Sequence, residues 1–308
     1  MRLIYMGTPQ FAVSPLRSLA ATGNEIAGVV TRTDKPSGRG RHVASPPVKL
    51  AASELGLAVY QPKRVKAPEF IDLLRNIGPD LIIVAAYGQM IPKEILMLPQ
   101  FGCVNIHASL LPLYRGAAPV NWAIIRGERE TGDTLMRMDE GMDTGPILMQ
   151  QRIPINTDDT AGTLTDKLSA LGAQLITAAV PLLASGKLIP VPQDNAQATM
   201  APLLKKEDGL IDWSLAAREI HDRVRGLSPW PGAYGYLDGK TVRIIATEVH
   251  DGVGEPGTLY ERDINILEAG TGSGLLRIMV LQPEGKRPMT AGEFIRGHRV
   301  AGKKFINS

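Results

Sequence analysis

The first half of this 308-residue chain alternates short apolar runs with stretches of helical character. Four runs have the length and apolar content of buried strands: Leu3–Met6, Ile26–Val30, Leu81–Ala85 and Val104–Ile106. Between them the sequence predicts helices over residues 11–21, 46–55 and 68–76. This alternation predicts a doubly wound α/β fold, in which a mostly parallel sheet carries helices on both faces. Ligands of such sheets bind at the carboxyl ends of the strands.

Two further strands, Thr134–Met138 and Ile147–Ile155, precede a helix that closes this first domain. The helix is predicted from apolar residues spaced three and four positions apart: Leu164, Leu168, Leu171, Leu175, Ala179 and Leu182. The prolines of Gly186–Pro192 cannot continue it and mark a linker. Because 308 residues are long for one core, we expect domains at residues 1–189 and 205–308, joined by a linker at 190–204.

The second domain has a different pattern. After one helix at about residues 215–227, five short strands are predicted: Tyr234–Leu237, Thr241–Val249, Gly257–Tyr260, Asn265–Leu267 and Leu275–Leu281. Asp238-Gly239 is a two-residue hairpin signal, and Thr290 with Glu293 forms a capping-box pattern for a last helix. These features predict a small antiparallel β-barrel, OB-like, a fold that includes nucleic-acid binders.

Composition narrows the class of protein. An apolar content of 44% with 21% charged residues is typical of a soluble globular chain and argues against disorder. Charge, Gly or Pro interrupts each apolar stretch, so we expect no membrane span of about 20 residues. The strand Leu3–Met6 and its Gly-Thr-Pro turn do not resemble a secretory signal, so a cytoplasmic location is expected.

The cysteine and histidine patterns argue against a metal centre. Cys103 is the only cysteine, which excludes an internal disulfide and a cysteine-based zinc site, and we interpret it as a small buried residue. The five histidines are far apart and show no ligand spacing: His42, His107, His221, His250 and His298. No metal is expected.

Positive charge is concentrated in residues 31–66, which hold eight Lys or Arg against two acidic residues, a local net charge of +6. The whole chain carries only +3. One basic segment on a nearly neutral protein suggests a polyanionic partner, although a solvated charged loop is the alternative.

The candidate chemistry lies on the strand that carries Asn105 and His107. Residues two apart on a strand point to the same face, so an amide and an imidazole lie side by side. The acidic loop at residues 139–145 can add the carboxylate of Asp143, which would orient the imidazole and favour its charged form. On residue types alone, a structural hydrogen-bonded pair remains as plausible as a catalytic one. Gly7-Thr8-Pro9 lacks the glycines of a dinucleotide turn, so a nicotinamide cofactor is not expected.

Three motifs together resemble the formyltetrahydrofolate-dependent formyltransferases. They are M-G-T-P-Q-F-A at residues 6–12, N-I-H-A-S-L-L-P-L-Y-R-G-A-A-P at 105–119 and D-E-G-M-D-T-G at 139–145. Within this family the sequence is most similar to the enzymes that act on methionyl-tRNA, because it also has the P-x-G-R-G loop at Pro36–Gly40 and the trailing S-P-W-P-G-A at 228–233. The resemblance extends over essentially the whole chain and implies the family's Rossmann variant for the first domain.

The resemblance implies a reaction and a set of site residues. A formyl group would pass from 10-formyltetrahydrofolate to the α-amine of methionyl-initiator tRNA, without a metal or a covalent intermediate. The implied catalytic residues are Asn105, His107 and Asp143, of which Asn105 would hold the oxyanion. The implied folate-binding residues are Ser109, Leu110, Leu111, Pro112, Tyr87, Met90 and Ile91. The implied tRNA-binding residues are Lys35, Arg39 and Arg41, acting through phosphates. A monomer is expected.

Other functions share parts of this pattern. A formyltransferase for a small amine would have little use for the basic segment or for a second domain. Hydrolysis of formyltetrahydrofolate would use the same trio with water. A folate- or RNA-binding protein without activity would be expected to lack at least one member of the trio. Trp213 and Trp230 suggest base stacking in the second domain, but core packing is favoured for them.

Overall fold

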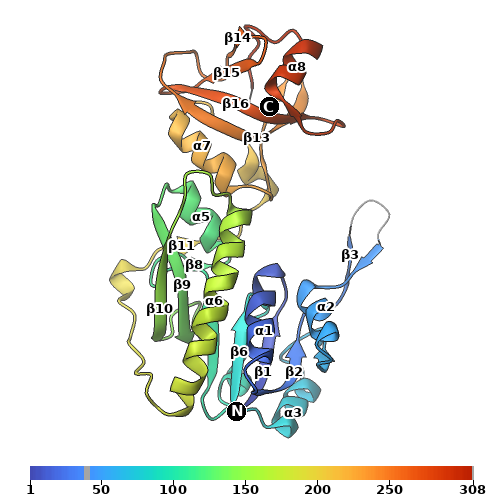
Figure 1. Ribbon diagram of the computed structural model, residues 1–308, viewed down its shortest axis with the longest axis vertical. Helices are drawn as coiled ribbons and strands as arrows, with labels where there is room; N and C mark the ends of the chain where they lie inside the picture. The colour runs from blue at the N-terminus through green and yellow to red at the C-terminus, as the bar shows by residue number, and fades with distance from the viewer. Residues whose placement is uncertain (38–41, 307–308) are drawn as a thin grey trace. The chain divides into compact units, whose positions relative to one another are not determined.

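The computed structural model describes residues 1–37 and 42–306, and their contacts divide the chain into two compact units (Figure 1). The first unit comprises residues 1–119, 130–154 and 165–201, and the second comprises 120–129, 155–164 and 202–308, within the described residues. Two segments that precede residue 165 therefore belong to the second unit. The domain limits expected from the sequence remain a prediction.

The first unit is built on a seven-stranded sheet with the order β10-β9-β7-β6-β1-β2-β5. The parallel strands are β1 (Arg2–Gly7), β2 (Glu25–Val30), β5 (Val59–Tyr60), β6 (Leu81–Ala85) and β7 (Cys103–His107). Two antiparallel strands, β9 (Glu130–Arg137) and β10 (Ile147–Pro154), extend one edge. The predicted doubly wound, mostly parallel sheet is confirmed.

Helices cover both faces of this sheet (Figure 1). The helices of this unit are α1 (Val13–Ala20), α2 (Pro47–Glu54), α3 (Pro68–Ile77), α4 (Lys93–Leu96) and most of α6 (Ala161–Ala184). Phe70 and Leu74 of α3 pack into one cluster with Ile82 and Cys103 from the strands. On the other face, a side chain at Gly172 of α6 would collide with Ile106. The predicted helices 11–21, 46–55 and 68–76 correspond to α1, α2 and α3, the first after a 3-10 turn.

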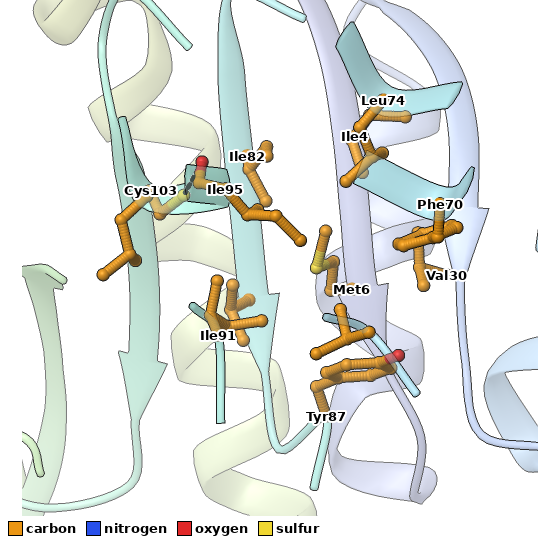
Figure 2. Close-up of a cluster of buried hydrophobic side chains, with 13 residues drawn as sticks. Ile4, Met6, Val30, Phe70, Leu74, Ile82, Tyr87, Ile91, Ile95 and Cys103 are labelled. Atoms are coloured by element: carbon orange, nitrogen blue, oxygen red, sulfur yellow. Dashed lines mark hydrogen bonds between the residues drawn. The ribbon is translucent and has the colours of Figure 1, made fainter. Parts of the chain in front are cut away.

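Figure 2 shows the cluster on the α3 face, where β-strand side chains interdigitate with α3 and the segment after β6. Cys103 lies inside it with its thiol 3.7 Å from the carbonyl oxygen of Ile95. Burial raises the pKa of this thiol to about 12, so Cys103 is a neutral thiol at physiological pH. The interpretation of Cys103 as a small buried residue is confirmed.

Helix α6 has 24 residues and is long and apolar enough, by length and composition, to cross a membrane. Its apolar sequence is nevertheless interrupted by Asp166, Lys167, Gly172 and Pro181, as expected from the sequence for each apolar stretch. Half of its apolar window is buried in this structure, and buried core helices pass the same test. Leu168, Leu175 and Ala179 are among its buried residues, as predicted for the helix that closes the domain.

The second unit contains helix α7 (Ala217–Gly226) and a six-stranded antiparallel sheet. Its strands are β12 (Ala233–Leu237), β13 (Lys240–His250), β14 (Leu259–Asp263), β15 (Ile266–Gly270), β16 (Leu275–Pro283) and β17 (Met289–Thr290). The hairpin Asp238-Gly239 has two positive φ angles, 52° and 73°, as a type I′ turn requires. Ile306 bridges to Tyr236 and Lys304 to Thr258, so the chain end links the two edges, and the predicted barrel is confirmed.

The remaining predictions for this unit hold in part. The capping box of α8 (Ala291–Gly297) is present, since Thr290 and Glu293 satisfy each other's backbone N–H groups. Trp213 is buried and stacks on Phe305 at 4.9 Å, which confirms core packing. Trp230 is 56% exposed, so core packing was wrong for this residue.

One buried carboxyl in the first unit has no compensating partner. Asp133 of β9 is fully buried against α6, and neither of its side-chain oxygens makes a hydrogen bond. Burial raises its pKa well above the usual range, and the backbone of Gly172 opposes that rise only in part. Burial therefore favours the protonated form of this carboxyl in the folded protein, whereas the unfolded chain ionises it above its ordinary pKa of about 4.

We predict that Asp133→Val stabilises the protein by about 1–3 kcal/mol at pH 7, because it removes an unsatisfied polar group and suits a strand. The folded state binds the extra proton, so wild-type stability falls as pH rises above about 4, until the folded pKa is reached. The advantage of the variant should therefore shrink as the pH is lowered towards 3. Urea unfolding across pH tests this, and an equal difference at every pH would contradict it.

Candidate functional site

Residues 86–91 follow the carboxyl end of β6. Side chains that follow β1 and β2 hydrogen-bond to the backbone of this segment. The hydroxyl of Thr8, just after β1, donates to the Tyr87 carbonyl at 2.8 Å, and Arg32, after β2, donates to the Gly88 carbonyl at 3.1 Å. Tyr87 and Ile91 are buried in the hydrophobic cluster, whereas Met90 is 77% exposed (Figure 2). Of the three predicted folate-binding residues in this segment, Tyr87, Met90 and Ile91, only Met90 thus presents its side chain to solvent.

Asn105, His107 and Asp143 come together, as their pattern predicted. Asn105 and His107 lie on the same face of β7. The amide Nδ2 of Asn105 lies 3.5 Å from Oδ1 of Asp143, and Nδ1 of His107 lies 3.7 Å from Oδ2. His107 is buried, while Asn105 and Asp143 are partly buried. An amide, an imidazole and a carboxylate therefore form one polar cluster next to an apolar core.

The two ring nitrogens of His107 have different partners. Nε2 lies 2.9 Å from the carbonyl oxygen of Tyr114, which can only accept, so Nε2 carries a proton. Nδ1 is the nitrogen that faces the Asp143 carboxylate. The backbone at Tyr114 thus fixes the ring orientation and leaves Nδ1 as the site of proton exchange.

The position of Asp143 depends on backbone donors and on an uncommon conformation. Its φ is +53°, in the left-handed region that few non-glycine residues adopt. The N–H of Gly116 donates to Oδ2 at 2.8 Å. Within the loop, Oδ1 of Asp139 accepts from the Gly141 N–H at 3.0 Å and the Thr144 hydroxyl at 2.7 Å. The acidic loop is therefore internally hydrogen-bonded, and it presents one carboxylate to the imidazole.

The turn at Ser109–Pro112 is held by a residue that the sequence analysis did not identify. Thr134 of β9 pairs with His107, and its hydroxyl donates to the Ser109 carbonyl at 2.6 Å and accepts from the Leu111 N–H at 3.1 Å. Gln150 donates to this hydroxyl at 2.7 Å and to the Leu111 carbonyl at 3.0 Å. Ser109, Leu110 and Leu111 are buried and Pro112 is partly exposed. The period-2 pattern of β9 placed Thr134 on this face, but nothing in the sequence indicated its partners.

The predicted tRNA-binding residues are only partly visible in the structure. Lys35 is exposed and begins β3 (Lys35–Ser37), which pairs with β4 (His42–Ala44). Arg39 and Arg41 lie outside the described residues. Nearby, hydrogen bonds from Lys49 and then Gln61 hold the pKa of Asp34 below its usual range. One cation of the basic segment, Lys49, is thus paired within the protein.

A second set of missed residues lies in the segment predicted as a linker. Gln193 and Asn195 accept hydrogen bonds from Arg115, and Gln193 also donates to the loop that carries Asp143. No periodicity or motif in residues 190–204 indicated this role. Among residues 1–37 and 42–306, no group of three or more His, Cys, Asp or Glu side chains is arranged to hold a metal ion.

Comparison with known proteins identifies the family. Residues 1–180 match the formyl transferase family, and residues 203–299 match the formyl transferase C-terminal domain. The methionyl-tRNA formyltransferase of Thermodesulfovibrio yellowstonii is 49% identical over 298 residues, 97% of this chain and 96% of the relative. That of Citrifermentans bemidjiense is 47% identical over 300 residues, 97% and 94% of the two chains. An N-formyltransferase from Helicobacter canadensis, solved with folinic acid and dTDP-3-aminofucose, has the same fold, with a TM-score of 0.66 at 19% identity over 90% of this chain and 97% of that one.

We predict that Thr134→Val weakens the turn at residues 109–112, because the Ser109 carbonyl and the Leu111 N–H lose their shared partner. Leaving buried backbone groups unsatisfied should cost about 1–3 kcal/mol in the free energy of unfolding. Thr134→Ser keeps the hydroxyl and should lose clearly less. Chemical denaturation of the three proteins tests this, and equal losses in both variants would mean that the methyl group, not the hydroxyl, matters.

Proposed function

The chain belongs to the formyl transferase family, and we propose that it transfers a formyl group from 10-formyltetrahydrofolate to the α-amine of methionyl-initiator tRNA. The product, N-formylmethionyl-tRNA, would serve translation initiation. The observation that carries this proposal is the cluster of Asn105, His107 and Asp143 in a chain that also carries the family's C-terminal domain. Relatives at 45–49% identity over nearly the whole chain are methionyl-tRNA formyltransferases, which favours this acceptor over a small amine.

The residues account for each part of an acyl transfer. The amine nitrogen attacks the formyl carbon, the new C–N bond forms, and the bond from that carbon to N10 of the folate breaks. The amide N–H of Asn105 would donate to the oxygen of the tetrahedral intermediate, where charge develops. Nδ1 of His107, beside Asp143, would take the proton that the amine loses and return one to N10. No covalent intermediate is needed, because the amine is itself a good nucleophile.

Substrate binding would be divided between the two domains. In the proposal the turn Ser109–Pro112, together with Tyr87, Met90 and Ile91, lines the folate site. Tyr87 and Ile91 are packed in the core, so they would support the backbone of the site. Met90 would contact the ligand directly. Lys35, Arg39 and Arg41 would bind phosphates of the acceptor arm, and residues 205–308 would add further tRNA contacts. We propose a monomeric cytoplasmic enzyme.

A formyl-transfer assay with four acceptors tests the proposal: methionyl-initiator tRNA, free methionine, an amino-sugar nucleotide and water. We expect transfer to charged tRNA only. Transfer to the amino sugar would favour the small-amine alternative, and release of formate in water would favour a hydrolase. A protein that binds folate but transfers nothing would be a binding protein without this activity.

We predict that His107→Ala and Asn105→Ala each lower kcat by about 100-fold or more, because one oxyanion donor is typically worth ~10²–10³ in turnover. Asp143→Asn keeps the shape but removes the charge, so it should be nearly as damaging. Single-turnover kinetics with charged tRNA measure these losses, and thermal unfolding verifies that each variant is folded. Near-wild-type rates in either alanine variant would refute the assignment of that residue.

We predict that Arg39→Ala and Lys35→Ala each lower kcat/KM for charged tRNA by about tenfold at low salt, with little change in folate affinity. Each phosphate contact should contribute about one unit to the dependence of log affinity on log salt, so the losses should shrink as salt rises. Arg75→Ala, on the exposed surface of α3, is the matched control. Unchanged tRNA kinetics in both variants would mean that this loop is a solvated charged loop that does not bind tRNA.

A further inference from the structure

Residues 191–201, which the sequence predicted as part of a linker, run along the first unit and contact two of its segments, residues 112–116 and the loop that carries Asp143. Val191 and Ile147 exchange two backbone hydrogen bonds of 2.8 Å, next to the end of the Asp143 loop. The hydroxyl of Thr199 accepts a hydrogen bond from the backbone N–H of Tyr114. Its carbonyl oxygen accepts one from the N–H of Arg115. Strand β11 (Met200–Ala201) then pairs with β8 (Arg115–Gly116). We refer to residues 191–201 as the strap.

Gln193 is the side chain of the strap that reaches the acidic loop. Its amide nitrogen donates to two backbone carbonyls of that loop, Asp143 at 2.9 Å and Gly145 at 2.7 Å. Its amide oxygen accepts two hydrogen bonds from Arg115, at 3.1 and 2.6 Å. One side chain therefore uses both of its polar atoms to connect Arg115 with the loop that carries Asp143.

Arg115 lies between the two backbone groups that contact the catalytic trio. The carbonyl of Tyr114 orients His107, and the N–H of Gly116 donates to Asp143. Arg115 itself is buried, and it also donates to Asn195 at 2.8 Å. The φ of Gly116 is +121°, and a Cβ there would lie 2.7 Å from the Ala201 carbonyl oxygen, so the strap packs directly against this backbone. Gln193 thus holds both the loop of the carboxylate and the segment that orients the imidazole.

The Asp143 loop needs such a tether because of where it begins. Strand β9 ends at Arg137, opposite Val104 in β7, three residues before His107. At about 3.3 Å per residue, the loop begins roughly 10 Å from His107 along the strand and must fold back to reach it. Its left-handed residue, Asp143, has a conformation that costs free energy unless the surroundings hold it.

We propose that Gln193 is a positioning residue for the reaction, which holds the Asp143 carboxylate against His107 through the Asp143 and Gly145 carbonyls. The inference rests on the proposed function and adds to it a residue from outside the catalytic motifs. The Gln193 amide bonds to Arg115 and to two backbone carbonyls, so in this proposal it acts on the rate through the position of Asp143. Gln193 then belongs to the active-site scaffold, although it lies in a segment that the sequence predicted as a linker.

Variants of Gln193 separate the two halves of its role. Gln193→Ala removes all four hydrogen bonds. Gln193→Glu keeps an acceptor for Arg115 but loses both donated bonds to the loop. We expect both to lower kcat by about 10- to 100-fold, as small misplacements of catalytic groups do, with a smaller change in the KM for folate. Gln197→Ala, an exposed glutamine of the same strap bonded only to Asp194, is the matched control and should leave kcat unchanged.

A double-mutant cycle with Asp143→Asn tests the route of the effect. If Gln193 acts through the carboxylate, Gln193→Ala should change the single-turnover rate less than about twofold in the Asp143→Asn background. A full additional loss in that background would overturn the proposal, as would wild-type kcat in Gln193→Glu. A loss of rate in Gln197→Ala equal to that in Gln193→Ala would also overturn it.

Hydrogen exchange at the Gly116 amide gives a readout that needs no catalysis. This N–H is bonded to Asp143, so it should exchange faster in Gln193→Ala than in the wild type, with global stability matched by denaturant. If the wild type fails to formylate charged tRNA while Gly116 exchange still responds, the proposed function is wrong but the positioning role of Gln193 stands. Unchanged exchange would overturn the positioning role whatever the activity.

Discussion

The pairing of β7 with β9 is the interaction on which the site depends. Strand β7 is parallel to β6 on one side and antiparallel to β9 on the other. The parallel side brings Asn105 and His107 to the carboxyl end of the sheet, and the antiparallel side places Thr134 directly opposite His107. Without this change of direction, neither the turn at 109–112 nor the acidic loop would reach the imidazole.

Near β7 and β9, backbone groups of the loops form hydrogen bonds with side chains. Loops next to a buried site expose N–H and C=O groups that must be satisfied. Thr134 and Gln150 satisfy the turn at 109–112, Gln193 satisfies the acidic loop, and Arg115 connects the segment after that turn to the strap. The geometry of Asn105, His107 and Asp143 is therefore set by residues that would take no part in the proposed chemistry.

Two neighbouring residues of β9 lie on opposite faces of the sheet, one next to the candidate site and the other against α6. Thr134 faces the site and makes three hydrogen bonds, whereas Asp133 faces α6 and makes none. The same alternation on β7 separates Asn105 and His107 from Ile106, which packs on α6. The sheet thus has a polar face at this end and a hydrophobic one behind it, where burial favours the protonated form of the Asp133 carboxyl.

By itself the sequence predicted the two fold classes, the order of the main strands and helices in each half, and that Asn105, His107 and Asp143 come together. Apolar periodicity is a local signal, and Asn105 and His107 share a face because they are two residues apart on one strand. Distant partners have no such signal. Only the tertiary structure brought Gln193 to the Asp143 loop, buried Tyr87 in the core and left Asp133 unpaired, because hydrogen bonds between segments far apart in the chain depend on how those segments pack.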